Sequence, residues 1–305
     1  MSAPSSRAVV LGGGGPVGVG WEVGLAAGLA KAGVHLADSD LVIGTSAGSL
    51  AGALLTSGED PGALVDQVET MFAAGVGTSG VDQVDMAGLA GLMEAMLGPE
   101  AAEATAEEIP TEQERLAEVG AIALAAETIS EDAFVGTMAP TLGGRAWPRH
   151  FACTAVDAVT GEFRLWDEAA GAPLERAVAS SCAVPGMYPP ITIDGKRYMD
   201  GGVRTMHNAD RAEGHDSVVV VSVMMTKLPP GIHDPRLEGF FAHQQAGIDH
   251  LRATGSAVEV IEPDVEFLTL SGMGMALMDF RLVAAAADAG VRLGKQEAER
   301  LRAIW

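Results

Sequence analysis

The chain has few cysteines and few basic residues for its 305 positions. Cys153 and Cys182 are too few for a disulfide framework, so we expect two core residues in a reducing compartment. The 19 Lys and Arg residues stand against 41 Asp and Glu residues, a formal net charge of −22. This imbalance argues against a nucleic-acid partner and against a strong static hold on anionic lipid.

Signals for export and for membrane insertion are also missing from the sequence pattern. Residues 1–10 hold one arginine and run directly into glycines, unlike a signal peptide. The longest uncharged run, 41–58, contains four glycines and five Ser or Thr residues, which argues against a transmembrane helix. We therefore expect a cytoplasmic protein with at most peripheral membrane contact, and the sequence gives no indication of its oligomeric state.

What the sequence does contain is an alternation of strand and helix patterns. Residues 7–11 predict a first strand, 12–18 a glycine-rich loop and 19–32 a helix. Residues 41–43 predict a second strand, and 47–56 predict its helix. These two strand–helix units are typical of an α/β sheet protein.

The remainder supports one domain spanning residues 1–305. Further strands are predicted at 149–155, 162–166, 191–193, 196–199, 218–223 and 265–270, and a further helix at 173–180. Apart from the strand at 265–270, the C-terminal region at about 236–305 is predicted to be helical.

Between these parts, residues 61–142 form a predicted helical, acidic insertion. Arg115 is its only basic residue between Glu94 and Asp132. The insertion is interpreted either as a set of solvated helical faces or as a cap over a functional site. In the second interpretation, Met86, Met93 and Met96 would meet an acyl chain.

A possible nucleophile lies directly after the second predicted strand. Gly44, Thr45, Ser46, Ala47 and Gly48 fit the G-x-S-x-G turn, in which a strand passes sharply into a helix and exposes the serine hydroxyl. Side chains in place of Gly44 or Gly48 would collide across so tight a turn. The alternative is an ordinary strand–helix turn without chemistry.

The glycine-rich loop at 12–18 has two functional interpretations. Gly13, Gly15 and Gly18 satisfy the dinucleotide pattern G-x-G-x-x-G between a strand and a helix. The ribose-binding acid of such a site follows the second strand, whereas Asp38 precedes it. A phosphate loop is excluded because no Gly-Lys-Ser/Thr follows. The other interpretation is an oxyanion hole built from glycine amides.

A fixed carboxylate is predicted where the strand at 196–199 ends. Asp200 is followed by Gly201 and Gly202, which places an acid at a strand end in an open turn. The alternative is a plain Asp-Gly turn.

Together these three motifs resemble the patatin-like phospholipase family, as do the stretches 152–162 and 179–190. The resemblance implies a three-layer α/β/α fold with a mainly parallel central sheet and a helical cap insertion. It implies Ser46 as nucleophile and Asp200 as base of a Ser-Asp dyad, without metal or organic cofactor. By the same resemblance, Gly13, Gly14 and Gly15 are oxyanion-loop positions, and a lipid or other acyl ester is the substrate. The family usually has Lys or Arg where this chain has Val17.

An aspartate with an ordinary pKa near 4 is a poor base at neutral pH, so Asp200 is expected to be desolvated. His207, seven residues farther on, is the rival base. His243 and His250 share a predicted helix face as possible metal ligands, but no carboxylate pattern accompanies them.

The leading hypothesis is a lipid acyl hydrolase that works through an acyl-enzyme intermediate. The first alternative is an NAD(P)-dependent oxidoreductase on the turn of Gly13, Gly15 and Gly18. The second is a catalytically inactive scaffold that binds lipid or a partner. The sequence does not separate hydrolysis from acyl transfer.

Overall fold

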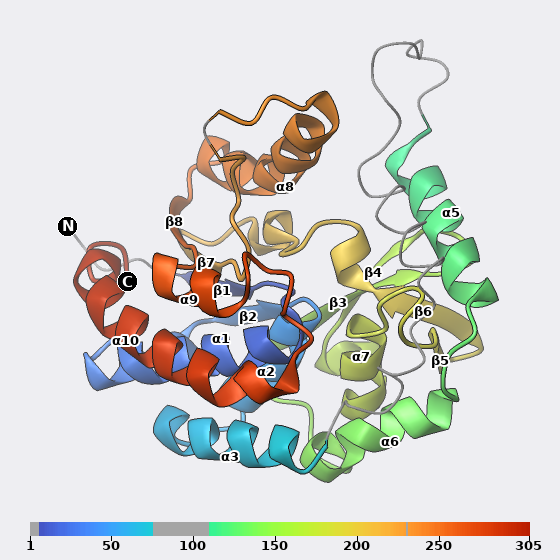
Figure 1. Cartoon of the computed structure of the whole chain (residues 1–305), viewed down its shortest axis with the longest axis horizontal. Helices are drawn as coiled ribbons and strands as arrows, with labels where there is room; N and C mark the ends of the chain where they lie inside the picture. The colour runs from blue at the N-terminus through green and yellow to red at the C-terminus, as the bar shows by residue number, and fades with distance from the viewer. Residues whose placement is uncertain (1–5, 76–109, 230) are drawn as a thin grey trace.

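The computed structural model describes residues 6–75, 110–229 and 231–305 of the chain. Its centre is an eight-stranded sheet in the order β5-β6-β3-β2-β1-β7-β8, with β4 paired to β3 (Figure 1). The strands of the parallel part are β1 (Arg7–Leu11), β2 (Leu41–Gly44), β3 (Phe151–Asp157), β7 (Ser217–Val221) and β8 (Ala257–Ile261). The antiparallel pairings involve β4 (Phe163–Trp166), β5 (Ile191–Ile193) and β6 (Lys196–Asp200). The sheet is therefore mostly parallel, as predicted.

Helices cover both faces of this sheet, so the predicted three-layer α/β/α class is confirmed. Val9 and Leu11 of β1 join the core under α1 (Gly15–Lys31) and α10 (Val283–Leu301). Ala8 and Val10 point to the opposite face and pack with α8 (Pro235–Ala253). Figure 1 shows α8 on one side of the strands and α1, α3 (Pro61–Ala73) and α10 on the other. The remaining α-helices of the described residues are α2 (Ala47–Leu55), α5 (Glu112–Ala125), α6 (Glu131–Leu142), α7 (Leu174–Ser181) and α9 (Val265–Leu270).

The contact between α1 and α10 is made by glycines. A Cβ on Gly24 would lie 2.1 Å from the carbonyl oxygen of Ala287, and a Cβ on Gly28 would lie 2.3 Å from that of Val291. On the other helix, a Cβ on Gly290 would lie 2.2 Å from the carbonyl oxygen of Trp21. The two backbones approach so closely that a methyl group does not fit between them.

Two sequence predictions in the C-terminal region are wrong. Residues 265–270, predicted as a strand, form α9, because the Asp264 carboxylate accepts the Phe267 N–H and starts a helix. Only Phe267 of this helix is fully buried, against Trp21 at a ring separation of 5.0 Å. The strand missed by the sequence is β8, which pairs in parallel with β7. The strand of the C-terminal region therefore lies at Ala257–Ile261 and not at 265–270.

The first helix also begins earlier than predicted, at Gly15 instead of residue 19. Gly15 adopts φ = +58°, and Pro16 fits the first turn, where no amide donor is required. The glycine-rich loop is consequently short, and its last residues belong to the helix.

The described parts of the predicted insertion, 61–75 and 110–142, contain α3, α5 and α6 and no strand. Met86, Met93 and Met96 lie outside the described residues. Over the described part of the chain, no helix is long and apolar enough to cross a membrane.

Candidate active site

Ser46 occupies a strained position between β2 and α2. Its backbone has φ = +52° and ψ = −117°, a conformation that non-glycine residues rarely adopt and that is found at functional turns. A Cβ on Gly44 would lie 2.3 Å from the Gly48 carbonyl oxygen, and a Cβ on Gly48 would lie 2.3 Å from that of Leu11. Both glycines are therefore required by the packing of this turn, as the sequence pattern predicted.

Asp200 is the last residue of β6, and its side chain is buried. The Gly202 N–H donates to Oδ1 at 2.7 Å, while Oδ2 has no hydrogen-bond partner among the described residues. Burial raises the pKa of Asp200 from 3.8 to about 7, although the nearby Ser46 hydroxyl and the Gly202 amide oppose this rise. The carboxyl group is thus desolvated, as expected from its proposed task.

The register of three strands brings Ser46 and Asp200 to one end of the sheet. Gly44 of β2 pairs with Cys153 of β3, and Asp200 pairs with Ala155, two residues farther along β3. The Ser46 hydroxyl is close enough to lower the pKa of the Asp200 carboxyl. Ser46 and Asp200, which are 154 positions apart in the sequence, therefore lie close together in the fold.

A buried polar network fixes the backbone on either side of this pair. The Asn208 amide donates to Thr45 Oγ1 at 3.2 Å and to the Gly201 carbonyl oxygen at 3.1 Å. Thr45 Oγ1 lies 2.8 Å from Thr154 Oγ1 on β3. Sequence analysis missed this network; its only signal was an asparagine in the loop after Asp200, and Asn208 adopts the left-handed φ of +52° that asparagine tolerates.

The amides of the glycine-rich loop are not equivalent. The Gly13 N–H donates to the Met206 carbonyl oxygen at 2.7 Å, so this amide is engaged within the protein. The amides of Gly14 and Gly15 make no hydrogen bond to a described residue, and neither does that of Ala47, the first residue of α2. Of the three predicted oxyanion-loop glycines, Gly14 and Gly15 are the ones with a donor to offer.

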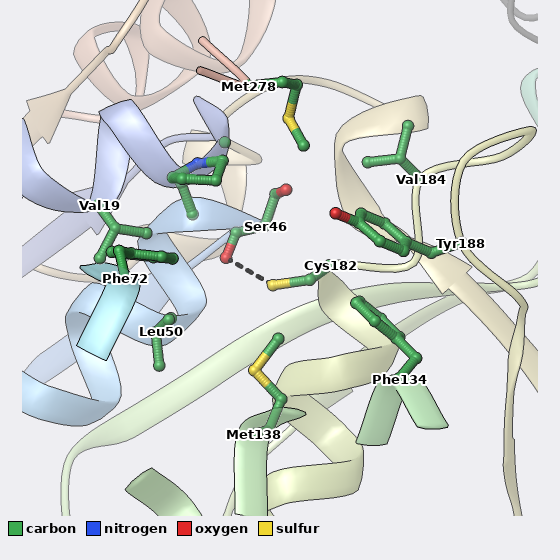
Figure 2. A pocket seen from close by; sticks show the side chains of 13 residues that line it. Val19, Ser46, Leu50, Phe72, Phe134, Met138, Cys182, Val184, Tyr188 and Met278 are labelled. Atoms are coloured by element: carbon green, nitrogen blue, oxygen red, sulfur yellow. Dashed lines mark hydrogen bonds between the residues drawn. The ribbon is translucent and has the colours of Figure 1, made fainter. Parts of the chain in front are cut away.

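A pocket with a cavity volume of about 60 Å³ opens next to Ser46 (Figure 2). Figure 2 shows the serine between a wall with Val19 and Phe72 and a wall with Phe134 and Tyr188. The aromatic rings of Phe134 and Tyr188 stack at a centroid distance of 4.2 Å. No charged side chain lines the pocket, which is composed of Gly15, Pro16, Val19, Ser46, Ala47, Leu50, Phe72, Phe134, Met138, Cys182, Val184, Tyr188 and Met278.

Cys182 lies in the same pocket, and both cysteines are free thiols. The Cys182 thiol donates to the Ser46 carbonyl oxygen at 3.2 Å (Figure 2). Burial, and secondarily the negative charge of Asp200, raises the pKa of this thiol to about 12. It is therefore protonated at neutral pH and acts as a hydrogen-bond donor that supports the Ser46 backbone.

The alternative histidines do not join this site. His207 lines a different, smaller pocket with Gln244, and no hydrogen bond connects it to Ser46 or Asp200. Burial lowers the pKa of His207 to about 4. His243 Nε2 lies 2.9 Å from the Arg204 carbonyl oxygen and His250 Nε2 lies 3.2 Å from Glu213. Within residues 6–75, 110–229 and 231–305, no His, Cys, Asp and Glu side chains gather as a metal site.

The dinucleotide interpretation meets an obstacle at the start of α1. The Val17 N–H donates to the Leu277 carbonyl oxygen at 3.2 Å. A Cβ on Gly15 would lie 2.8 Å from that same oxygen and 2.8 Å from Met278 Sδ. The Leu277 carbonyl oxygen therefore engages the Val17 amide, one of the donors that a pyrophosphate at this helix end would need. Val17 itself is fully buried, so this position presents no side chain to the site.

Comparison with known proteins identifies the family of the chain. The family model of patatin-like phospholipases matches residues 9–212, which include Ser46 and Asp200. The chain belongs to the patatin-like phospholipase family. Residues 213–305 lie outside the matched region. No curated protein sequence matches the chain.

Among solved structures, the chain is similar to VipD from Legionella pneumophila, with 16% identity and a TM-score of 0.47. That similarity covers 98% of this chain and 68% of VipD. It is also similar to ExoU in the complex of SpcU and ExoU from the type III secretion system of Pseudomonas aeruginosa, with 15% identity and a TM-score of 0.37. That similarity covers 97% of this chain, which spans 54% of the solved chain's length.

Proposed function

We propose that this patatin-like phospholipase is a serine lipid acyl hydrolase with Ser46 and Asp200 as its catalytic dyad. The observation that carries the proposal is the buried Asp200 carboxyl, with a pKa of about 7, beside a serine in a strained turn that opens into an apolar pocket. A carboxyl with this pKa is substantially ionised at neutral pH and still basic enough to take a proton.

In the proposed reaction, Ser46 Oγ attacks the ester carbonyl carbon while its proton passes to Asp200 Oδ2, the carboxyl oxygen without a partner. The negative charge that develops on the carbonyl oxygen is stabilised by the amides of Gly14 and Gly15, with Ala47 as a further donor. The ester bond then breaks, and the leaving alcohol takes the proton from Asp200. Water then attacks the acyl carbon while Asp200 takes a proton from it. The bond between the acyl carbon and Ser46 Oγ breaks, Asp200 returns the proton to Ser46 Oγ, and the carboxylic acid leaves.

The lining of the pocket supports an acyl chain as the part of the substrate that is buried. Leu50, Phe72, Phe134, Met138 and Met278 offer apolar contact but no charge for a head group. Two of them come from α6 and one from α3, so we also propose that the insertion at 61–142 acts as a cap over the site of a single domain spanning 1–305.

The test is intact mass after exposure to a long-chain fluorophosphonate. We expect one adduct on the wild type, none on Ser46→Ala, and at least about a hundredfold slower labelling of Asp200→Asn. Ser57→Ala is the matched control, because Ser57 lies two residues beyond the far end of α2, and this variant should label like the wild type. Folded wild-type protein without an adduct would overturn the proposal.

A finer choice concerns the acceptor of the acyl group. Water and a small alcohol both fit the mechanism, because either can give its proton to Asp200. Adding glycerol to a turnover assay separates them: the glycerol ester appears only if acyl transfer competes with hydrolysis.

A further inference from the structure

The loop between α9 and α10 is unlike the rest of this acidic chain. Residues 267–278 contain no charged side chain, although the whole chain has a net charge of −22. We call residues 271–278 the methionine loop, because it contains Met273, Met275 and Met278. The loop lies outside the region matched by the family model.

The methionine loop presents apolar side chains to the solvent. Met275 is 90% exposed and Met273 is 59% exposed, while Val265 at the start of α9 is 79% exposed. Single exposed apolar side chains are common on protein surfaces. Several of them in one segment are uncommon, and exposed apolar patches mark sites of contact with another protein or a membrane. Methionine suits an irregular apolar contact because its side chain is flexible and polarisable.

The same loop reaches the candidate active site within three residues. Met278 is half-buried, lines the pocket and stands above Ser46 in Figure 2. The neighbouring Leu277 carbonyl oxygen accepts the Val17 N–H at the start of α1. An object that contacts Met275 from outside is therefore within three residues of a side chain that lines the acyl pocket.

Aromatic contacts anchor both ends of the loop, and the carboxylates that flank it form ion pairs or cap a helix. On one side the ring of Phe267 lies 5.0 Å from that of Trp21, and on the other the ring of Phe280 lies 5.9 Å from that of Phe72. Glu266 pairs with Arg292 at 2.6 Å, Asp279 pairs with Arg281 at 2.7 Å, and Asp264 caps α9. The loop is consequently a fixed apolar projection without net charge of its own.

We propose that the methionine loop docks the protein on the surface of lipids without net charge, where Met273 and Met275 enter the acyl region and Met278 guides a chain toward Ser46. The occupant is a zwitterionic or neutral lipid surface because the loop offers apolar area without any basic residue for an anionic one. This inference rests on the proposed function and specifies how its substrate is presented, as lipid in an aggregate.

The first measurement is co-sedimentation of Ser46→Ala protein with phosphatidylcholine vesicles, so that binding is observed without hydrolysis. Adding Met275→Glu should lower the partition coefficient at least about tenfold, since a charge replaces a side chain that enters the lipid. Val159→Glu is the matched control. Val159 is 64% exposed and lies in the β3–β4 turn near α5, so its substitution should leave binding unchanged.

The second measurement compares hydrolysis of phosphatidylcholine vesicles with hydrolysis of a soluble short-chain ester. In Met275→Glu, we expect the ratio of the two rates to fall at least about tenfold, whereas Val159→Glu keeps the wild-type ratio. Equal binding by Met275→Glu and the reference protein would overturn the docking proposal. So would loss of self-association in Met275→Glu without any vesicle binding, which would identify a second copy of the chain as the occupant. A failed Ser46 labelling experiment with intact vesicle binding would reject the catalytic proposal instead.

Discussion

Asp200 is a carboxyl group that the fold keeps away from water. Because the pKa of Asp200 is raised to about 7, the carboxylate becomes protonated as the pH falls below about 7, and the enzyme then loses its base. An exposed aspartate would become protonated only near pH 4. We expect the logarithm of kcat/KM for a soluble ester to rise with unit slope up to about pH 7 and then to level off. A rise that ends near pH 4 would contradict Asp200 as a desolvated base, and the fluorophosphonate labelling rate should follow the same profile.

The same burial predicts a pH-dependent stability. Between pH 4 and about 7 the folded protein keeps a proton on Asp200 that the unfolded chain releases, so this group stabilises the fold below pH 4 and loses that contribution as the pH rises. Asp200→Asn has no such loss. Its free energy of unfolding, relative to the wild type, should therefore increase between pH 4 and pH 8, on the order of a few kcal/mol. Urea unfolding of both proteins at pH 4 and pH 8 measures this difference. Glu22 is also buried with a raised pKa, but it is present in both proteins, so its contribution cancels from the difference.

Asn208 connects the turns that carry the two catalytic candidates. Asn208→Ala should destabilise the protein by about 1–3 kcal/mol, because it leaves the Gly201 carbonyl oxygen buried without this donor. The substitution should also slow the labelling of Ser46, since Thr45 loses the Asn208 amide. Asn208→Gly is the control: it removes the amide but accepts the left-handed backbone. If Gly behaves like the wild-type Asn, backbone strain and not the hydrogen bonds explains the effect of Ala.

Among the elements, the pair α1 and α10 holds the helical layer under the active site. Gly24→Ala places a methyl group against the Ala287 backbone and should cost about 1–3 kcal/mol or more in the free energy of unfolding. Gly239→Ala makes the same change within α8, at an exposed position with no atom near its Cβ, and should be stabilising by up to about 1 kcal/mol. Thermal unfolding of both variants measures the difference. Equal midpoints would show that the helices separate to admit the methyl group.

The elements that the sequence predicted best are those with strong local signals. The strand predicted at 218–223 is a continuous β-branched run and corresponds to β7. The strands predicted at 191–193 and 196–199 are separated only by Asp194 and Gly195, a tight-turn pair, and form the antiparallel pair β5 and β6. The assignment of β8 and α9 failed because both segments are short and partly exposed, so periodicity is weak. Pairing with β7 decides β8, and the cap at Asp264 together with the contact of Phe267 decides α9.

At the scale of the whole molecule, the site depends on contacts between distant segments that the sequence motifs do not predict. The Gly44 to Gly48 turn and Asp200 could be selected from the sequence because their chemistry depends on local residue types. The engagement of the Gly13 amide depends on Met206, and the Met206 N–H in turn donates to Gln244 on α8 at 2.7 Å. These partners lie far apart along the chain, so which amide is free could not be predicted from the loop alone.

The net charge of −22 acts on the whole molecule as it approaches a lipid surface. Phosphatidylserine mixed into phosphatidylcholine vesicles should lower the initial hydrolysis rate at low salt, because the protein and the surface then repel each other. High salt should restore the rate, since the Debye length falls from about 10 Å at 0.1 M to about 3 Å at 1 M. Hydrolysis of a soluble neutral ester is the control and should change little over the same salt range. A rate that rises with phosphatidylserine would mean that basic side chains elsewhere on the protein, and not the uncharged methionine loop, control docking.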